Sequence, residues 1–230
     1  MDDIQARNSA AELLVADARR FTSHGGLLLE HVLARFFPLV YDLPASEQHH
    51  HRWRFGLVDH CLEVALDTLF RISTAARRSN AVAQLVAPTL AVALFHDLGK
   101  LFDVIVEDPT SGERWYPLVE SLSSFLNRPE MNASTSIRTS WRRGRGFMGH
   151  PEQEQLLKMM TPEDWTSPVL AISMQYETRF RRYPVRAEPP LDYLANAIAR
   201  ADGQSAWHGS PQHPQRGQYL QRLLSSAEAA

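Results

Sequence analysis

The chain has 230 residues, of which 44% are hydrophobic and 22% are charged, a composition that excludes a protein disordered throughout its length. The single cysteine, Cys61, excludes an internal disulfide framework and argues against a zinc site built on thiolates. With a formal net charge of -2, any contact with nucleic acid needs a local basic patch. No apolar run approaches the ~20 residues of a membrane span, and the acidic N-terminus lacks a signal-peptide pattern, so we expect a cytoplasmic protein without membrane insertion.

Helical periodicity dominates the chain, and convincing strand alternation is absent from the sequence. The predicted fold class is therefore all-α, a helical bundle that forms a single domain over residues 1–230. The predicted helices cover residues 2–20, 27–40, 56–78, 88–98, 151–160, 168–180 and 190–206. The remaining expectations are an N-terminal helical extension over 1–40, a turn at 107–117, an irregular loop at 127–149 and a flexible C-terminal tail over 208–230.

The strongest chemical signal is the run His96-Asp97-Leu98-Gly99-Lys100, which closes an apolar helix. An imidazole and a carboxylate at the end of such a helix are costly to bury unless both are satisfied. A divalent metal satisfies both, and the pair suits Mn, Fe, Zn, Mg or Ni without a thiolate. Gly99 ends the helix and leaves its end open to substrate, so that Lys100 can meet an anion.

Two further residues fit the same site. His60 lies three residues after Leu57 on the apolar face of its helix, and Asp202 lies four residues after Ile198 on the last long helix. Alone, an inward histidine is more often a hydrogen-bonded core residue, and Asp202 could cap the polar segment that follows it. Together with the adjacent His-Asp pair they favour a metal site with positions open to water or a phosphate oxygen. The predicted metal ligands are His60, His96, Asp97 and Asp202.

This pattern resembles the HD superfamily of metal-dependent phosphohydrolases, which are all-helical enzymes with an H…HD…D ligand set. The resemblance spans roughly residues 56–206 and rests on the HDLGK run, an upstream histidine and a downstream aspartate. It implies an HD-domain helical bundle with a divalent metal cofactor, for which we favour Mn. It also implies that His96, Asp97 and Lys100 take part in catalysis.

A narrower resemblance covers about residues 27–100. The segments LPASEQHHH (43–51) and GLVDHCLEVA (56–65), followed by HDLGK, are similar to the N-terminal domain of MobH-type relaxases, which process DNA in conjugative plasmids and integrative elements. The resemblance implies single-stranded or nicked DNA as substrate and conjugation proteins as partners. One departure is Phe55, which stands where the family has the first glycine of a Gly-Gly pair before the helix of His60.

Four more histidines are candidate ligands. Three consecutive imidazoles, His49, His50 and His51, cannot all face one point, so one or two could bind a second metal or a phosphate, or all three could form a solvated loop. His150 precedes a proline at a helix start, where its ring could reach the site. Many two-metal HD enzymes have a histidine there and another on the next helix, but residues 173–177 of this chain contain none, which departs from the two-metal pattern.

A basic stretch could bind a polyanion. Arginine pairs with phosphates and tryptophan stacks on unpaired bases, although a solvated loop has the same composition. The candidate phosphate- or DNA-binding residues are Lys100, Trp141, Arg142, Arg143, Arg145 and Arg179. Tyr116 and Tyr176 could be considered as covalent nucleophiles, but no neighbour in the sequence activates either one.

The leading hypothesis is a metal-dependent phosphodiesterase of HD type that processes DNA for a mobile element. Lys100 and the loop arginines would stabilise the extra negative charge that develops on the phosphate. Two alternatives remain open at this point. One is an HD hydrolase of small nucleotides, and the other is a non-catalytic DNA-binding or assembly subunit that keeps the fold.

Overall fold

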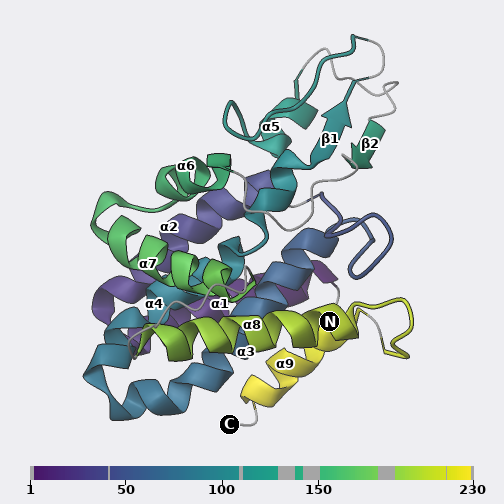
Figure 1. Cartoon of the computed structure of the whole chain (residues 1–230). Coiled ribbons are helices and arrows are strands. Elements are labelled where there is room, and N and C mark those ends of the chain that lie inside the picture. Colours follow the sequence, from purple (N-terminus) through teal and green to yellow (C-terminus); the bar gives the residue numbers. More distant parts are fainter. Residues whose placement is uncertain are drawn as a thin grey trace.

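A computed structural model describes residues 3–40, 42–108, 111–128, 138–141, 151–180, 190–215 and 217–228. These residues form helices α1 (Asp3–Phe21), α2 (Ser23–Val40), α3 (Gly56–Arg78), α4 (Asn80–Phe95), the 3-10 helix η1 (Leu98–Phe102), α5 (Leu122–Leu126), α6 (Pro151–Met160), α7 (Glu163–Phe180), α8 (Leu191–His208) and α9 (Tyr219–Glu228), with strands β1 (Val104–Glu107) and β2 (Arg138–Trp141). The predicted all-α class is confirmed (Figure 1).

The centre of the bundle is α3, which packs against α1, α4, α8 and α9. Figure 1 shows α8 crossing the front of the bundle with α9 beneath it, while the short strands project at the opposite end. Both α3 and α4 are buried over most of their length: α4 because its residues are apolar nearly all around the helix, and α3 because other helices pack around it and also bury polar residues such as His60 and Glu63. This packing brings one end of α4 against the middle of α8 and the first turns of α3.

Three helices begin earlier than the sequence predicts: α2 at Ser23, α4 at Asn80 and α7 at Glu163. Pro88 and Pro168 both lie inside their helices, α4 and α7. An interior proline removes one backbone hydrogen bond, yet α4 continues through it because Val82 and Val86 are buried in the core on the N-terminal side. Burial of the apolar residues before the proline therefore outweighs the preference of proline for the first turn of a helix.

The segment Asn80–Phe102 has the length and apolar composition of a membrane span, with a mean hydropathy of 1.5, contrary to the expectation from the sequence. In the structure, 72% of the apolar window is buried inside the protein. The helix α4 lies against α2, α3 and α7, as a core helix of a bundle does.

The strands were not predicted. They pair antiparallel, with Val104 opposite Trp141 and Glu107 opposite Arg138. Each has four residues, too few to show an alternating pattern in the sequence. The described part of the expected turn at 107–117 follows β1, and the backbone N–H of Asp108 donates to the carbonyl of Glu113 at 2.9 Å.

Both ends of the described chain contribute to the core. On α1, Ala10 and Leu14 are buried against the rest of the bundle, in the segment expected to be an extension. Within the expected tail, α9 packs against α1 and α3 and buries Leu220, Leu223 and Leu224. The sequence reading missed this short apolar stripe.

Candidate metal centre

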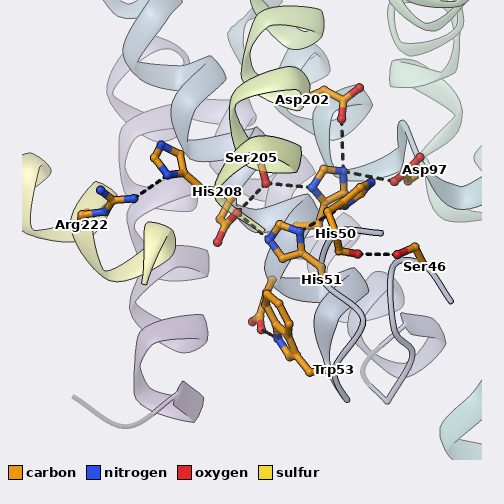
Figure 2. A network of polar contacts seen from close by, with 12 residues as sticks. Ser46, His50, His51, Trp53, Asp97, Asp202, Ser205, His208 and Arg222 are labelled. Atoms are coloured by element: carbon orange, nitrogen blue, oxygen red, sulfur yellow. Dashed lines mark hydrogen bonds and ion pairs between the residues drawn. The ribbon is translucent and has the colours of Figure 1, made fainter. Parts of the chain in front are cut away.

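Three predicted ligands, His60 of α3 and His96 and Asp97 at the end of α4, lie close enough together to hold one ion. The fourth, Asp202 of α8, lies beside both histidines. The Nε2 atoms of His60 and His96 are 3.1 Å apart. Nε2 of His60 lies 3.3 Å from a carboxylate oxygen of Asp97 and 3.3 Å from one of Asp202. Nε2 of His96 lies 3.7 and 3.6 Å from the same two oxygens. Figure 2 shows Asp97 and Asp202 reaching the cluster from different elements.

The protons on the two rings make the cluster suited to a cation. Nδ1 of His96 donates to the carbonyl of Ala93 at 2.7 Å, so its Nε2 carries a lone pair when the ring is neutral. Nδ1 of His60 is 2.9 Å from the hydroxyl of Ser205, which leaves Nε2 of His60 facing the cluster. Two ring nitrogens and two carboxylates thus face one another. All four are hydrogen-bond acceptors when the rings are neutral, and one proton among them cannot pair with every acceptor. A metal ion bound by neutral imidazoles and carboxylates fits this donor set.

Charge in the cluster supports the same interpretation. Burial lowers the pKa of His60, but hydrogen bonds with Asp202 and Asp97 outweigh burial and raise the pKa to about 9. Burial opposes the charge on both carboxylates, yet Lys100 and His96 hold the pKa of Asp97 well below its usual range. Hydrogen bonds with His60 and His96 likewise lower the pKa of Asp202. The two carboxylates remain ionised and favour positive charge between them.

Lys100 and Tyr176 each contact one of the two carboxylates. Nζ of Lys100, in η1, lies 2.5 Å from Oδ2 of Asp97, an oxygen that is buried and makes no hydrogen bond of regular geometry within the described residues. The hydroxyl of Tyr176, on α7, donates to Asp202 at 3.1 Å. Burial, together with the charges of Asp202 and Asp97, raises the pKa of Tyr176 well above its usual value, so the phenol keeps its proton. Tyr176 therefore orients a candidate ligand.

The triple histidine divides into three environments. His49 is exposed. The ring of His50 lies 4.7 Å from that of His60, centroid to centroid, and burial together with the charge of His60 lowers the pKa of His50 to about 3. His51 is fully buried and its Nε2 donates to Glu63 at 2.9 Å (Figure 2). The rings of His50 and His51 thus lie beside that of His60, and His49 does not join them.

Phe55 keeps the backbone conformation that a glycine would supply. Its φ is 70°, in the left-handed region that a bulky residue rarely adopts. The guanidinium groups of Arg7 and Arg54 lie 4.6 and 4.8 Å from the ring centroid, and these cation–π contacts offset part of the strain. The departure from the family's Gly-Gly pair thus leaves the turn before α3 in a glycine-like conformation.

Several predicted residues cannot be placed. Arg142, Arg143, Arg145 and His150 lie outside the described residues. The backbone of Trp141 belongs to β2 and that of Arg179 to α7, but their side chains are outside what the structure describes. The basic DNA-binding surface therefore stays a prediction.

Two functional neighbours were missed from the sequence. Glu63 is a buried carboxylate three residues after His60 on α3, and Ser205 is three residues after Asp202 on α8. The helical spacing of Glu63 from His60 was a usable signal, because a carboxylate on a buried face needs a partner. No pattern of this kind marks Ser205.

Comparison with known proteins gives one result. Residues 19–145 match a family model described as "TraI_2: Putative helicase". No curated protein and no solved structure matches the chain. The matched region covers more than half of the chain. It contains the loop with His49, His50 and His51 (the histidine loop), His60 and the run from His96 to Lys100, whereas Asp202 lies beyond it. The chain therefore belongs to the TraI_2 family.

Proposed function

We propose that the chain is a metal-dependent phosphodiesterase of HD type that acts on DNA during conjugative transfer. The observation that carries the proposal is the convergence of His60, His96, Asp97 and Asp202 on one point. Their order along the chain is that of the HD phosphohydrolases which the sequence resembles. The resemblance to MobH-type relaxases supports DNA, single-stranded or nicked, as the substrate.

These four side chains would hold a divalent ion, for which we favour Mn. A metal ion supplies Lewis-acid stabilisation of a phosphoryl oxygen and lowers the pKa of a coordinated water. His50 is the loop histidine we expect to add a further nitrogen, because its ring is close to His60 and its lowered pKa keeps it neutral. Nε2 of His51 is already paired with Glu63, and His49 is exposed.

The protein's own residues would set the charge at the site. Lys100 contacts Asp97 and keeps a partly accessible ammonium at the edge of the cluster, where it could attract a phosphate. Tyr176 holds one oxygen of Asp202 and leaves the other facing the histidines. We expect Arg142, Arg143 and other basic residues of that segment to bind the DNA backbone.

The description of the family as a helicase points to a different activity. The loop that cradles nucleotide phosphates in many helicases has the form G-x-x-x-x-G-K-[ST], and this chain contains no such run. Within the part of the chain that the structure describes, the metal centre is the group of residues that favours hydrolytic chemistry. We therefore assign it cleavage of phosphodiesters, and no strand separation.

The test is cleavage of single-stranded and nicked DNA with Mn, Mg, Zn, Ni or Fe, run in parallel with nucleoside mono-, di- and triphosphates, together with metal analysis of the purified protein. Asp97→Ala should remove bound metal and cleavage together, since it deletes a ligand, whereas Asp164→Ala, at an exposed position on α7, should retain both. Metal-dependent cleavage that persists in Asp97→Ala would reject the assignment. Hydrolysis of small nucleotides alone, or DNA binding by a metal-free protein, would favour the other two readings.

A further inference from the structure

A chain of buried polar groups extends from the metal centre toward the histidine loop. The hydroxyl of Ser205 lies 2.9 Å from Nδ1 of His60 and donates to Oε2 of Glu63 at 2.5 Å. The same oxygen of Glu63 accepts a hydrogen bond from Nε2 of His51 at 2.9 Å. Each of these side chains is buried, and Figure 2 shows Ser205 and His51 as members of this network, joined to it by dashed lines. It joins α3, α8 and the loop behind the candidate ligands.

The direction of each hydrogen bond follows from the groups themselves. An ionised carboxylate only accepts, so the single hydroxyl hydrogen of Ser205 goes to Glu63. The hydroxyl oxygen must then accept from His60, which places a hydrogen on Nδ1 of that ring. In the neutral ring, Nε2 is left with a lone pair aimed at Asp97 and Asp202. By the same reasoning His51 carries its hydrogen on Nε2.

The surrounding backbone is shaped to hold His51 in place. A Cβ at Gly209 would overlap Nδ1 of His51, and a Cβ at Gly56 would overlap its carbonyl oxygen. The backbone N–H of His51 donates to the carbonyl of Gly209 at 3.2 Å, at the C-terminal end of α8. His51 also has a φ of 47°, a left-handed conformation that histidine tolerates better than most residues. The loop is thus held in place at His51, where the polar chain reaches it.

We propose that Ser205 and Glu63 are positioning residues for the metal centre, which fix His60 as the tautomer that can bind a cation through Nε2. Through His51, Glu63 also sets the position of the loop that carries His50. The inference rests on the metal centre proposed above, and it concerns residues that do not touch the ion. Partners of this kind orient a ligand ring, and their loss lowers metal affinity by about 10- to 100-fold.

The test compares the full chain with Ser205→Ala by calorimetric titration with Mn. Ser205→Ala should weaken the Kd about 10- to 100-fold, because Nδ1 of His60 loses its acceptor and the ring its orientation. The matched control is Thr89→Val, which removes another buried hydroxyl, one that donates to the carbonyl of Leu85 at 2.6 Å away from the polar chain. This variant should bind Mn as the wild-type chain does.

A spectroscopic measurement separates positioning from a general loss of structure. In the Zn-loaded protein, the hydrogen on Nδ1 of His60 should give a downfield NMR signal that exchanges slowly with water, assigned by its loss in His60→Ala. The signal should vanish or exchange rapidly in Ser205→Ala and persist in Thr89→Val. Glu63→Gln keeps an oxygen that can accept both hydrogen bonds but removes the charge, so we expect the signal to remain and the Mn affinity to fall.

The outcomes are distinguishable. Tight Mn binding by the wild-type chain, together with an equal Kd and an unchanged signal in Ser205→Ala, would overturn the positioning role and leave the metal centre intact. No Mn or Zn binding by the wild-type chain would overturn the metal centre itself. If Ser205→Ala does not fold, Glu63→Ala, which removes the acceptor of the Ser205 hydroxyl, decides, and an unchanged Kd in that variant would overturn the proposal.

Discussion

A proton and a metal ion compete for His60. Its Nε2 lies between the carboxylates of buried Asp97 and partly exposed Asp202, which favour positive charge, and in the metal-free protein this charge is a proton held with a pKa of about 9. A cation at the same point needs the neutral ring, so binding of the ion must release that proton. The pH dependence of binding and of stability therefore has a predictable sign.

We predict that the metal-free protein loses stability as the pH rises from about 6.5 to 9. A pKa raised above the unfolded value of 6.5 contributes stability that is complete below pH 6.5 and disappears as the pH passes the folded pKa of about 9. Mn affinity should rise over the same interval, because fewer rings hold the competing proton. Thermal unfolding with a chelator, and titrations with Mn at each pH, measure the two effects.

His60→Ala serves as the control for this prediction. It removes the titrating ring, so the decline in melting temperature between pH 6.5 and 9 should be much smaller in the chelated variant. An equally steep decline in His60→Ala would assign the pH dependence to another group.

At the same scale, the sequence located His60, His96, Asp97 and Asp202 because apolar spacing and a compact motif mark them. Among the partners that hold these residues, Glu63 is marked only by its helical spacing from His60, and Ser205 is not marked at all. Ser205 donates to Glu63 across a separation of 142 residues, and such a contact exists only once α3 and α8 have packed. Tyr176 was considered as a nucleophile, and only the fold places its hydroxyl on Asp202.

At the scale of elements, α1 is fastened to α3 by a buried ion pair. The guanidinium of Arg7 donates to the two carboxylate oxygens of Asp59 at 2.6 and 3.1 Å, and the indole of Trp53 donates to the same carboxylate at 2.9 Å. Asp59 directly precedes His60. The first helix thus supports the turn from which a candidate ligand projects.

We predict that Arg7→Ala lowers the free energy of unfolding by about 3 kcal/mol, because it leaves a largely buried carboxylate without its cation. Arg19→Ala, also on α1, breaks an exposed pair with Glu30 of α2 and should cost less than about 1 kcal/mol. Urea denaturation of the two variants measures both values. Equal losses would show that the Arg7 pair is no more than a surface contact.

The sequence predicted the helical elements well where an amphipathic or apolar pattern runs for several turns, as in α3 and α8. The prediction was wrong at the start of α4, because Pro88 was expected in the first turn and instead lies inside a buried helix. It also missed β1 and β2, which pair over a long separation in the chain. It also missed α9, whose three buried leucines form a stripe of only two turns. These errors share one cause, since tertiary packing decided each element against a weak local signal.

For the molecule as a whole, the candidate ligands tie together parts of the chain that are distant in sequence. An ion held by α3, the end of α4 and α8 binds the folded state and has no preformed site in the unfolded chain. Metal binding should therefore be visible as an increase in global stability.

We predict that free Mn at about 100 times its Kd raises the free energy of unfolding by about 2.7 kcal/mol. Asp202→Asn should abolish this increase, because an amide cannot replace the charged ligand. Asp192→Asn, at the other end of α8, should retain the increase. Denaturation with and without Mn measures the difference, and an undiminished increase in Asp202→Asn would exclude that carboxylate as a ligand.

The position of Asp202 has a consequence for biogenesis. Residues 19–145, which carry the family resemblance, supply both imidazoles and the first acid, but the final acid is on α8. During synthesis, His60, His96 and Asp97 therefore leave the ribosome well before Asp202 does. If the ion is held by all four groups, the growing polypeptide completes the site only after α8 has docked, and a fragment limited to residues 19–145 should bind metal more weakly than the whole chain.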